Sequence, residues 1–230
     1  MFSPLQDLLS IFFPSYCYSC GQPLVGDERY LCGKCLLHLP TTHYAAVPDN
    51  LTEQRFMGRF PFQAATSLLY YEHGGEAQKL VHHIKYYEKV SFAEQMGRML
   101  GRELTASGRF DQVELLVPIP LHPLKQLRRG YNQSELLCKG IAATFPRPIC
   151  TNAVKRRTNT TSQTNKNRIQ RMDNMQDVFL LKRPQAIEGK HILVVDDVIT
   201  TGATTSACCQ ELLKAPDVTI SIASLGIAGV

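Results

Sequence analysis

The chain has 230 residues, of which 44% are hydrophobic and 20% are charged. This composition is typical of a globular protein and excludes a disordered tail, a collagen, a coiled coil, a mucin and a membrane channel. The length predicts one ordinary domain with a small additional module. No apolar stretch approaches the ~20 residues of a membrane helix, and the first residues lack the basic start of a signal peptide. We therefore expect a cytoplasmic protein without membrane insertion.

The formal net charge of +5 is distributed unevenly along the chain. Between Leu124 and Arg171 there are eleven basic residues and one acidic residue, Glu135, so this stretch carries +10 and the rest of the chain carries −5. Clustered positive charge attracts anionic ligands, which leads us to expect that this stretch meets one. The alternative is a solvated basic loop.

Four of the eight cysteines form two C-x2-C pairs separated by eleven residues: Cys17, Cys20, Cys32 and Cys35. Each pair can place two thiolates on one turn, and two such turns complete a tetrahedral site for a structural Zn²⁺. In a reducing compartment, clustered thiols bind metal more often than they form disulfides. A redox pair and unrelated thiols are the alternatives, but two copies this close favour a shared metal.

Hydrophobic periodicity predicts the following elements. Residues 1–58 form the small module, which begins with a short amphipathic segment, and residues 59–230 form the main domain. In the main domain we expect strands at residues 64–71, 114–119, 191–195 and 218–227, and helices at 76–87, 91–106, 132–145 and 202–214. Strands that alternate with helices predict an α/β fold with a parallel sheet. Residues 149–178 are polar with little periodicity, which is typical of a functional lid or a disordered loop.

The most informative motif follows the strand at 191–195. Asp196 and Asp197 come directly after that strand. A loop then leads into a helix, with the residues Thr200, Thr201, Gly202, Ala203 and Thr204. Free N–H groups at a helix start and threonine hydroxyls bind phosphate, and glycine lets the backbone approach it. Adjacent carboxylates can accept hydrogen bonds from a ribose diol.

Open α/β sheets bind their ligands at the carboxyl ends of their strands, so the motif predicts a ribose phosphate at this place. A chance acidic turn with a threonine cap is the alternative. Neither GxxxxGK[ST] nor GxGxxG occurs in the chain, which argues against a kinase, an ATPase and a dehydrogenase.

Residues 192–205 resemble the phosphoribosyl-pyrophosphate (PRPP) motif of type I phosphoribosyltransferases. Further segments resemble the ComF/GntX family over nearly the whole chain: Phe12–Pro14, Leu31–Cys32, Pro118–Pro123, Arg129–Gln133, and Arg156, Thr160, Gln163, Arg171, Asn174 and Phe179. Asp177 and Lys166 depart from the family pattern, within the expected lid. The resemblance implies a type I phosphoribosyltransferase fold with an N-terminal zinc finger, and a role in natural competence and DNA utilisation.

The resemblance also implies roles for individual residues. Asp196 and Asp197 would hold the ribose hydroxyls, and Thr200–Thr204 would hold the 5′-phosphate. Transfer from PRPP expels pyrophosphate, so the site needs cations: Mg²⁺ bound with PRPP, and basic side chains for which the candidates are Arg128, Arg129 and Arg171. The segment after Arg156 would be a lid that excludes water.

Two functions fit these residues. In the first, the chain is an enzyme that transfers phosphoribose from PRPP to an acceptor and releases pyrophosphate. In the second, it is a non-catalytic competence or regulatory factor that binds PRPP or single-stranded DNA, with other competence proteins as further partners. The basic stretch serves either function, since DNA phosphates also attract clustered Arg and Lys. The sequence identifies neither the acceptor nor the oligomeric state, and Lys85 fits a surface lysine and a site residue equally well.

Overall fold

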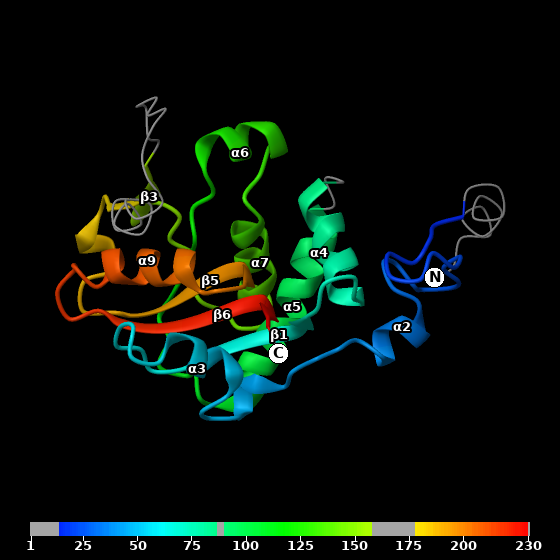
Figure 1. Ribbon diagram of the computed structural model, residues 1–230, viewed down its shortest axis with the longest axis horizontal. Helices are drawn as coiled ribbons and strands as arrows, with labels where there is room; N and C mark the ends of the chain where they lie inside the picture. The colour runs from blue at the N-terminus through cyan, green and yellow to red at the C-terminus, as the bar shows by residue number, and fades with distance from the viewer. Residues whose placement is uncertain (1–13, 87–89, 158–177, 230) are drawn as a thin grey trace.

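The centre of the computed structural model is a parallel sheet; the structure describes residues 14–86, 90–157 and 178–229 (Figure 1). The sheet has four strands in the order β1 (Ala65–Tyr71), β6 (Thr219–Ala228), β5 (His191–Ile199) and β2 (Leu115–Pro118). All three neighbouring pairs are parallel. The α/β class predicted from the sequence is therefore confirmed, with β5 in the interior of the sheet.

The residues of β5 explain why helices cover both faces of this sheet. Successive side chains of a strand point to opposite faces. Leu193 and Val195 belong to one buried hydrophobic cluster, whereas Ile192 and Val194 belong to another, and all four are fully buried. A continuous apolar run of this kind is typical of a parallel strand that is covered on both sides.

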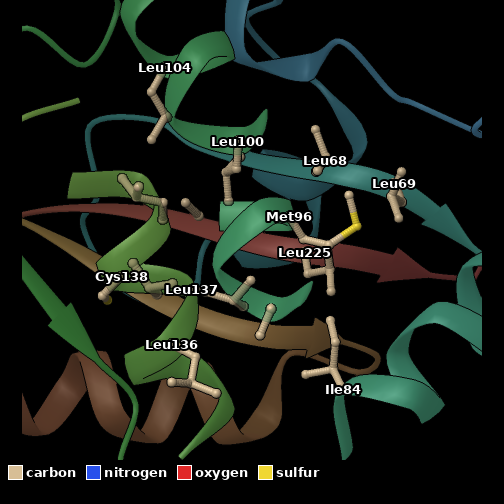
Figure 2. Packing of buried hydrophobic residues seen from close by; sticks show 14 of the residues in the cluster. Leu68, Leu69, Ile84, Met96, Leu100, Leu104, Leu136, Leu137, Cys138 and Leu225 are labelled. Atoms are coloured by element: carbon tan, nitrogen blue, oxygen red, sulfur yellow. The ribbon is translucent and has the colours of Figure 1, made fainter. Parts of the chain in front are cut away.

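Three helices cover the first face: α4 (Glu76–Tyr86), α5 (Val90–Ser107) and α7 (Gln133–Ala142). Figure 2 shows Met96 and Leu100 of α5 and Leu137 of α7 packed beside Leu225 of β6. Full burial of such a side chain stabilises the fold by about 1.5–3 kcal/mol. This cluster packs α4 against the sheet and thereby fixes the position of its carboxyl-terminal end.

Glycines form a seam between α5 and α7. A Cβ atom on Gly97 would overlap the carbonyl oxygen of Leu137, and one on Gly140 would overlap the carbonyl oxygen of Glu94. A Cβ atom on Gly101 would overlap Oγ1 of Thr144 and the carbonyl oxygen of Ile141. The two backbones are therefore in direct contact along this seam, and only glycine allows that approach.

The second face is covered by α9 (Ala203–Leu212) and α3 (Leu51–Phe56). Cys208 and Leu212 of α9 and Phe56 of α3 are fully buried in the second cluster. Asn50 begins α3, because its side chain accepts hydrogen bonds from the N–H groups of Thr52 at 2.9 Å and Glu53 at 3.2 Å. Such a cap stabilises a short helix that the hydrophobic pattern does not predict.

Beyond the edge strand β2 lie α6 (Pro123–Arg129) and an antiparallel hairpin of β3 (Val154–Arg156) and β4 (Phe179–Leu181). Figure 1 shows α6 standing away from the sheet. The prediction that residues 149–178 lack regular structure is wrong at its amino-terminal end, because β3 pairs with β4 there. Residues 158–177, which include Arg171 and most of the expected lid, lie outside the described residues.

The N-terminal module packs on the helices of the first face through aromatic rings. The ring of Tyr18 stacks on His83 of α4, with 4.5 Å between centroids, and meets Phe92 of α5 edge-on at 5.1 Å. Residues 14–58 contain the short helix α2 (Gly33–Leu37) and the 3-10 turn η1 (Tyr44–Ala46), and a second 3-10 turn, η2 (Pro184–Ala186), precedes β5. The division of the chain at residue 58 stays a prediction. Within the described ranges, no helix is long and apolar enough to cross a membrane.

Candidate functional site

Asp196 and Asp197 lie at the carboxyl end of β5, which continues through both acids to Ile199, farther than the sequence predicts. Asp196 is only 8% exposed. Its Oδ2 accepts a hydrogen bond from the hydroxyl of Thr205 at 2.7 Å, and its Oδ1 accepts one from the backbone N–H of Asp197 at 2.9 Å. The buried carboxyl group is thus oriented by α9 and by its own strand, while Asp197 reaches the surface of the site.

The pair is electrostatically strained. Burial and the neighbouring charge of Asp197 raise the pKa of Asp196 to about 7. Two adjacent carboxylates resist simultaneous ionisation unless a cation or hydrogen-bond donors compensate them. The end of β5 is therefore suited to a ligand that brings hydroxyl donors or a metal ion.

Lys85 supplies one compensating charge. Its Nζ lies 2.9 Å from Oδ2 of Asp197, and both side chains are about one quarter exposed. The structure therefore places Lys85 in the site, where the sequence left its position open. Lys85 directly follows the buried Ile84 in the last turn of α4. In the sequence, the only indication that Lys85 belongs to the site was its position directly after Ile84, which packs toward the sheet.

The hydroxyl loop, residues 200–204, joins β5 to α9. Gly202 is the N-cap residue of α9 and has a φ of 76°, in the left-handed region. Thr200, Thr201 and Thr204 are exposed at the surface of the loop. The first N–H groups of a helix have no partner within the helix and carry a partial positive charge. Together with the threonine hydroxyls, they form a donor-rich surface for an anion next to the two acids.

Two arginines that the sequence analysis missed hold this loop. Arg55 of α3 donates to the carbonyl oxygen of Thr200 and, at 2.8 Å, to that of Ala228 at the end of β6. Arg59 donates to the carbonyl oxygen of Thr201 at 2.8 Å. Arg55 is 145 residues from Thr200 in sequence, and no motif links them.

The same contacts leave no space beside Gly202. A Cβ atom there would lie 2.9 Å from Cε1 of Phe56, and close to the Arg55 and Arg59 side chains. The loop is therefore clamped from behind by α3 and the residues after it, which fixes the positions of its N–H groups.

The basic residues of the +10 stretch do not all lie near the site at the end of β5. Arg128 is exposed on α6, and Nη1 of Arg129 donates to Oε1 of Gln133 at 3.0 Å. Arg147 lies at the opposite end of the sheet, where it donates to the carbonyl oxygens of Val113 and Asp111. The +10 stretch is thus divided among several surfaces. A role of Arg128, Arg129 and Arg171 at a pyrophosphate stays a prediction.

The four clustered cysteines lie together as predicted. The Sγ atoms of Cys17, Cys20, Cys32 and Cys35 all lie within 4.8 Å of one another. Those of Cys20 and Cys32 are 3.8 Å apart, and a tetrahedral site with Zn–S distances of ~2.3 Å has sulfur–sulfur edges of about 3.8 Å. The donor set therefore fits a structural zinc ion, with no position left for a substrate.

The thiols of this cluster have unequal proton affinities. Burial opposes ionisation of Cys17, but the backbone N–H groups of Cys20, Cys32 and Ser19 stabilise its thiolate and lower the pKa to about 6. Burial raises the pKa of Cys35 to about 12, and the neighbouring thiols contribute to the rise. A divalent cation among the four sulfurs would favour the ionised form of all of them.

Comparisons with known proteins give relatives for most of the chain. No family model matches it. It is 27% identical over 226 residues to the DNA utilization protein YhgH of Shigella flexneri, covering 91% of this chain and 95% of that one. It is 26% identical over 206 residues to Competence protein F of Haemophilus influenzae, covering 88% and 80%. Competence protein ComFC of Bacillus subtilis matches at 30% identity over 104 residues, 45% of this chain and 40% of that protein.

Among solved structures, the chain matches a glutamine PRPP amidotransferase from B. subtilis with a TM-score of 0.42 and 16% identity, over 62% of this chain and 30% of that one. A hypoxanthine phosphoribosyltransferase from Staphylococcus aureus matches with a TM-score of 0.36 and 15% identity, over 57% and 62%. The chain thus spans less than a third of the amidotransferase. The chain is a homologue of the DNA utilization protein YhgH, Competence protein F and ComFC, which confirms the resemblance found in its sequence.

Proposed function

We propose that the chain binds PRPP at the carboxyl end of β5 and transfers its phosphoribosyl group to an acceptor, with release of pyrophosphate. The names of the homologues support a role of this reaction in competence and DNA utilisation. One observation carries the proposal: the paired carboxylates of Asp196 and Asp197 lie directly beside the donor-rich hydroxyl loop.

This arrangement fits the two ends of a ribose 5-phosphate. The 5′-phosphate binds the first N–H groups of α9 and the hydroxyls of Thr200, Thr201 and Thr204. The ribose 2′- and 3′-hydroxyls donate to Asp196 and Asp197, and these hydrogen bonds stabilise both carboxylates in the ionised form. Arg55 and Arg59 bind no ligand atom in this scheme; they hold the loop in place.

In the reaction, the bond between the anomeric carbon and the pyrophosphate oxygen breaks, and pyrophosphate leaves with the electron pair. A nucleophilic atom of the acceptor forms the new bond to the same carbon. Positive charge develops on the ribose ring, and the nearby carboxylates stabilise it. Lys85 lies beside Asp197 and can interact with the negative charge of the leaving group.

Two metal ions fit the residues present. Asp196 and Asp197 offer the oxygen donors that Mg²⁺ prefers, directly or through ordered water, and Mg²⁺ bound with PRPP would neutralise charge on the pyrophosphate. The four cysteines would hold a structural Zn²⁺ that connects the halves of the N-terminal module.

Titration calorimetry with Mg²⁺ and PRPP tests the site. We expect one PRPP per chain and a loss of measurable binding in the variant Asp196→Asn plus Asp197→Asn. Asp217→Asn, a change of an exposed aspartate, is the matched control and should bind as the wild type does. Unchanged affinity in the double variant would refute the site.

Turnover is tested separately, by pyrophosphate release from PRPP in the presence of bases, nucleosides and DNA. Release that depends on one acceptor class and on Asp197 supports the enzyme. If PRPP binds but no member of the panel releases pyrophosphate, the binding factor is favoured.

The second candidate function is that of a factor that binds PRPP or single-stranded DNA without turnover. The observation that favours it is a run of three consecutive cations: Lys155 and Arg156 of β3, and Arg157 directly after the strand. We expect single-strand affinity to fall steeply with salt, and the slope to decrease when Arg156 and Arg157 are replaced by Gln. An affinity that does not change with salt would exclude these residues as a DNA surface.

A further inference from the structure

A second cavity lies beyond the edge of the sheet, apart from the site at β5. It has a volume of about 480 Å³, within the range of ~300–1,000 Å³ that is typical of small-molecule sites. Its walls come from three parts of the chain that are distant in sequence: residues 120–135, 151–156 and 182–183. None of the residues of β5 or of the hydroxyl loop lines it.

Hydrogen bonds stabilise each of these walls. β3 and β4 form an antiparallel pair, and the N–H of Lys182 donates to the carbonyl oxygen of Ala153 at 2.7 Å. On the other side, Nδ2 of Asn132, which is 3% exposed, donates to the carbonyl oxygen of Ile119 at 3.0 Å. One wall is therefore a pair of hydrogen-bonded strands, and the other is held by a buried side-chain amide.

The lining has a strong excess of positive charge. Four cations contribute to it: Lys155, Arg156, Lys182 and Arg183. Only one acid, Glu135, faces them in the lining. In the described parts of the chain, none of the four forms an ion pair with a carboxylate. Four cations held together with only one acid favour an anionic ligand with several charges.

The rest of the lining fits a ring and polar groups. Pro120, Leu121 and Pro123, which follow β2, and Val154 of β3 give apolar surface, and Gln126 and Asn152 contribute amides. The guanidinium of Arg156 is held over the ring of Phe179, 5.5 Å from its centroid, which orders one of the four cations. Phosphates need cations, and a base needs an apolar wall and amide partners.

We propose that this cavity binds a nucleoside polyphosphate. Its phosphates contact Lys155, Lys182 and Arg183, and its base packs on the proline and leucine wall. The site is distinct from the proposed PRPP site and does not depend on PRPP binding or on turnover.

Titration calorimetry with ATP tests the proposal. The exposed pair Lys182→Gln plus Arg183→Gln should weaken ATP binding at least tenfold. The matched control is Lys125→Gln plus Lys139→Gln, which removes the same charge from exposed positions of the basic stretch outside the cavity. The control should change the ATP affinity less than twofold. An equal loss in both pairs would overturn the proposal, because general charge would then explain binding.

Two more comparisons separate a nucleotide site from a charged surface and from the PRPP site. ATP should bind more tightly than tripolyphosphate, and tripolyphosphate that binds as tightly as ATP contradicts the role of the apolar wall. ATP should still bind to Asp196→Asn plus Asp197→Asn, and PRPP should still bind to Lys182→Gln plus Arg183→Gln. If Asp196→Asn plus Asp197→Asn abolishes ATP binding, the nucleotide binds at β5 and the second site does not exist.

Discussion

Nζ of Lys85 lies 2.9 Å from Oδ2 of Asp197, so that the end of α4 meets the end of β5 through an ion pair. In the sequence, α4 and β5 are separated by a long segment that contains α5, β2 and α7. The pair compensates one of two adjacent carboxylates. Within the described residues, Asp196 accepts its hydrogen bonds from the hydroxyl of Thr205 and the N–H of Asp197, and neither donor is a cation. Lys85 therefore ties the end of α4 to the acidic end of β5.

A double-mutant cycle measures this pair. Lys85→Met and Asp197→Asn should show a coupling of roughly 0.5–1 kcal/mol in the free energy of unfolding at neutral pH, the range of partly exposed ion pairs. Urea denaturation of the four proteins gives the value. Lys79→Met, an exposed lysine on the same helix, is the control and should be additive with Asp197→Asn. Additive effects for Lys85 as well would show that the ion pair contributes nothing.

The clamp behind the hydroxyl loop gives a second prediction. Gly202→Ala should reduce PRPP affinity at least tenfold, because its Cβ would meet Phe56 and shift the loop. Gly189→Ala is the matched control: Gly189 also has a positive φ, of 67°, but no atom lies within 4 Å of its Cβ position.

Both substitutions should cost about 1–2 kcal/mol of stability for the left-handed backbone, with a larger cost at Gly202. Only Gly202→Ala should alter PRPP binding, measured by calorimetry. Equal PRPP affinities in the two variants would mean that the clamp does not position the loop.

The raised pKa of Asp196 makes stability depend on pH. The pKa is about 7 in the folded chain and 3.8 without the environment of the fold, so the folded state binds more protons between these values. Stability therefore falls as the pH rises through this window. Asp196→Asn cannot ionise, so its stability relative to the wild type should increase as the pH rises from 4 to 8.

Chemical denaturation of both proteins at several pH values checks this difference. Asp217→Asn, at an exposed aspartate, should show no such dependence. A stability difference for Asp196→Asn that is the same at pH 4 and pH 8 would contradict the assignment. The variant should gain stability relative to the wild type as the pH rises and should lose PRPP, as is common for strained residues of a binding site.

The cysteine cluster predicts one Zn²⁺ per chain in elemental analysis of the purified protein. Cys20→Ser should lose the metal, because three thiolates and a hydroxyl bind zinc more weakly, and the midpoint of thermal unfolding should fall. Cys150→Ser, outside the cluster, should keep both the metal and the midpoint. If the purified wild-type protein contained no zinc, the assignment of the four cysteines as a zinc site would be wrong.

Periodicity predicted the sheet well because the strands and helices are strongly patterned. The predicted strand at 64–71 is β1 at Ala65–Tyr71, and the predicted helix at 91–106 is α5 at Val90–Ser107. Helix α3 was not predicted, since its six residues are too few to show a helical period, and the helix depends on the Asn50 cap and on contact with β1. Short elements of this kind are stabilised by tertiary contacts, not by a pattern in sequence.

The site was predictable where its residues are consecutive and hidden where they are not. The residues from Asp196 to Thr204 are consecutive in the chain, so the sequence alone shows that two carboxylates are followed by a hydroxyl-rich loop. Arg55 acts on the loop through backbone carbonyls, which any residue provides, so no residue type in the loop indicates it. Lys85 was left open because a helix surface offers many lysines, and only packing decides which one reaches an acid.

The glycine seam between α5 and α7 has a practical consequence for mutational screens. Gly97, Gly101 and Gly140 lie on helices of the first face, yet each lacks room for a single methyl group. In a saturation screen these three positions should reject every substitution, as completely as the aspartates of the site do. A map of intolerant positions would then contain two groups of unrelated origin, and a stability assay without ligand would separate them.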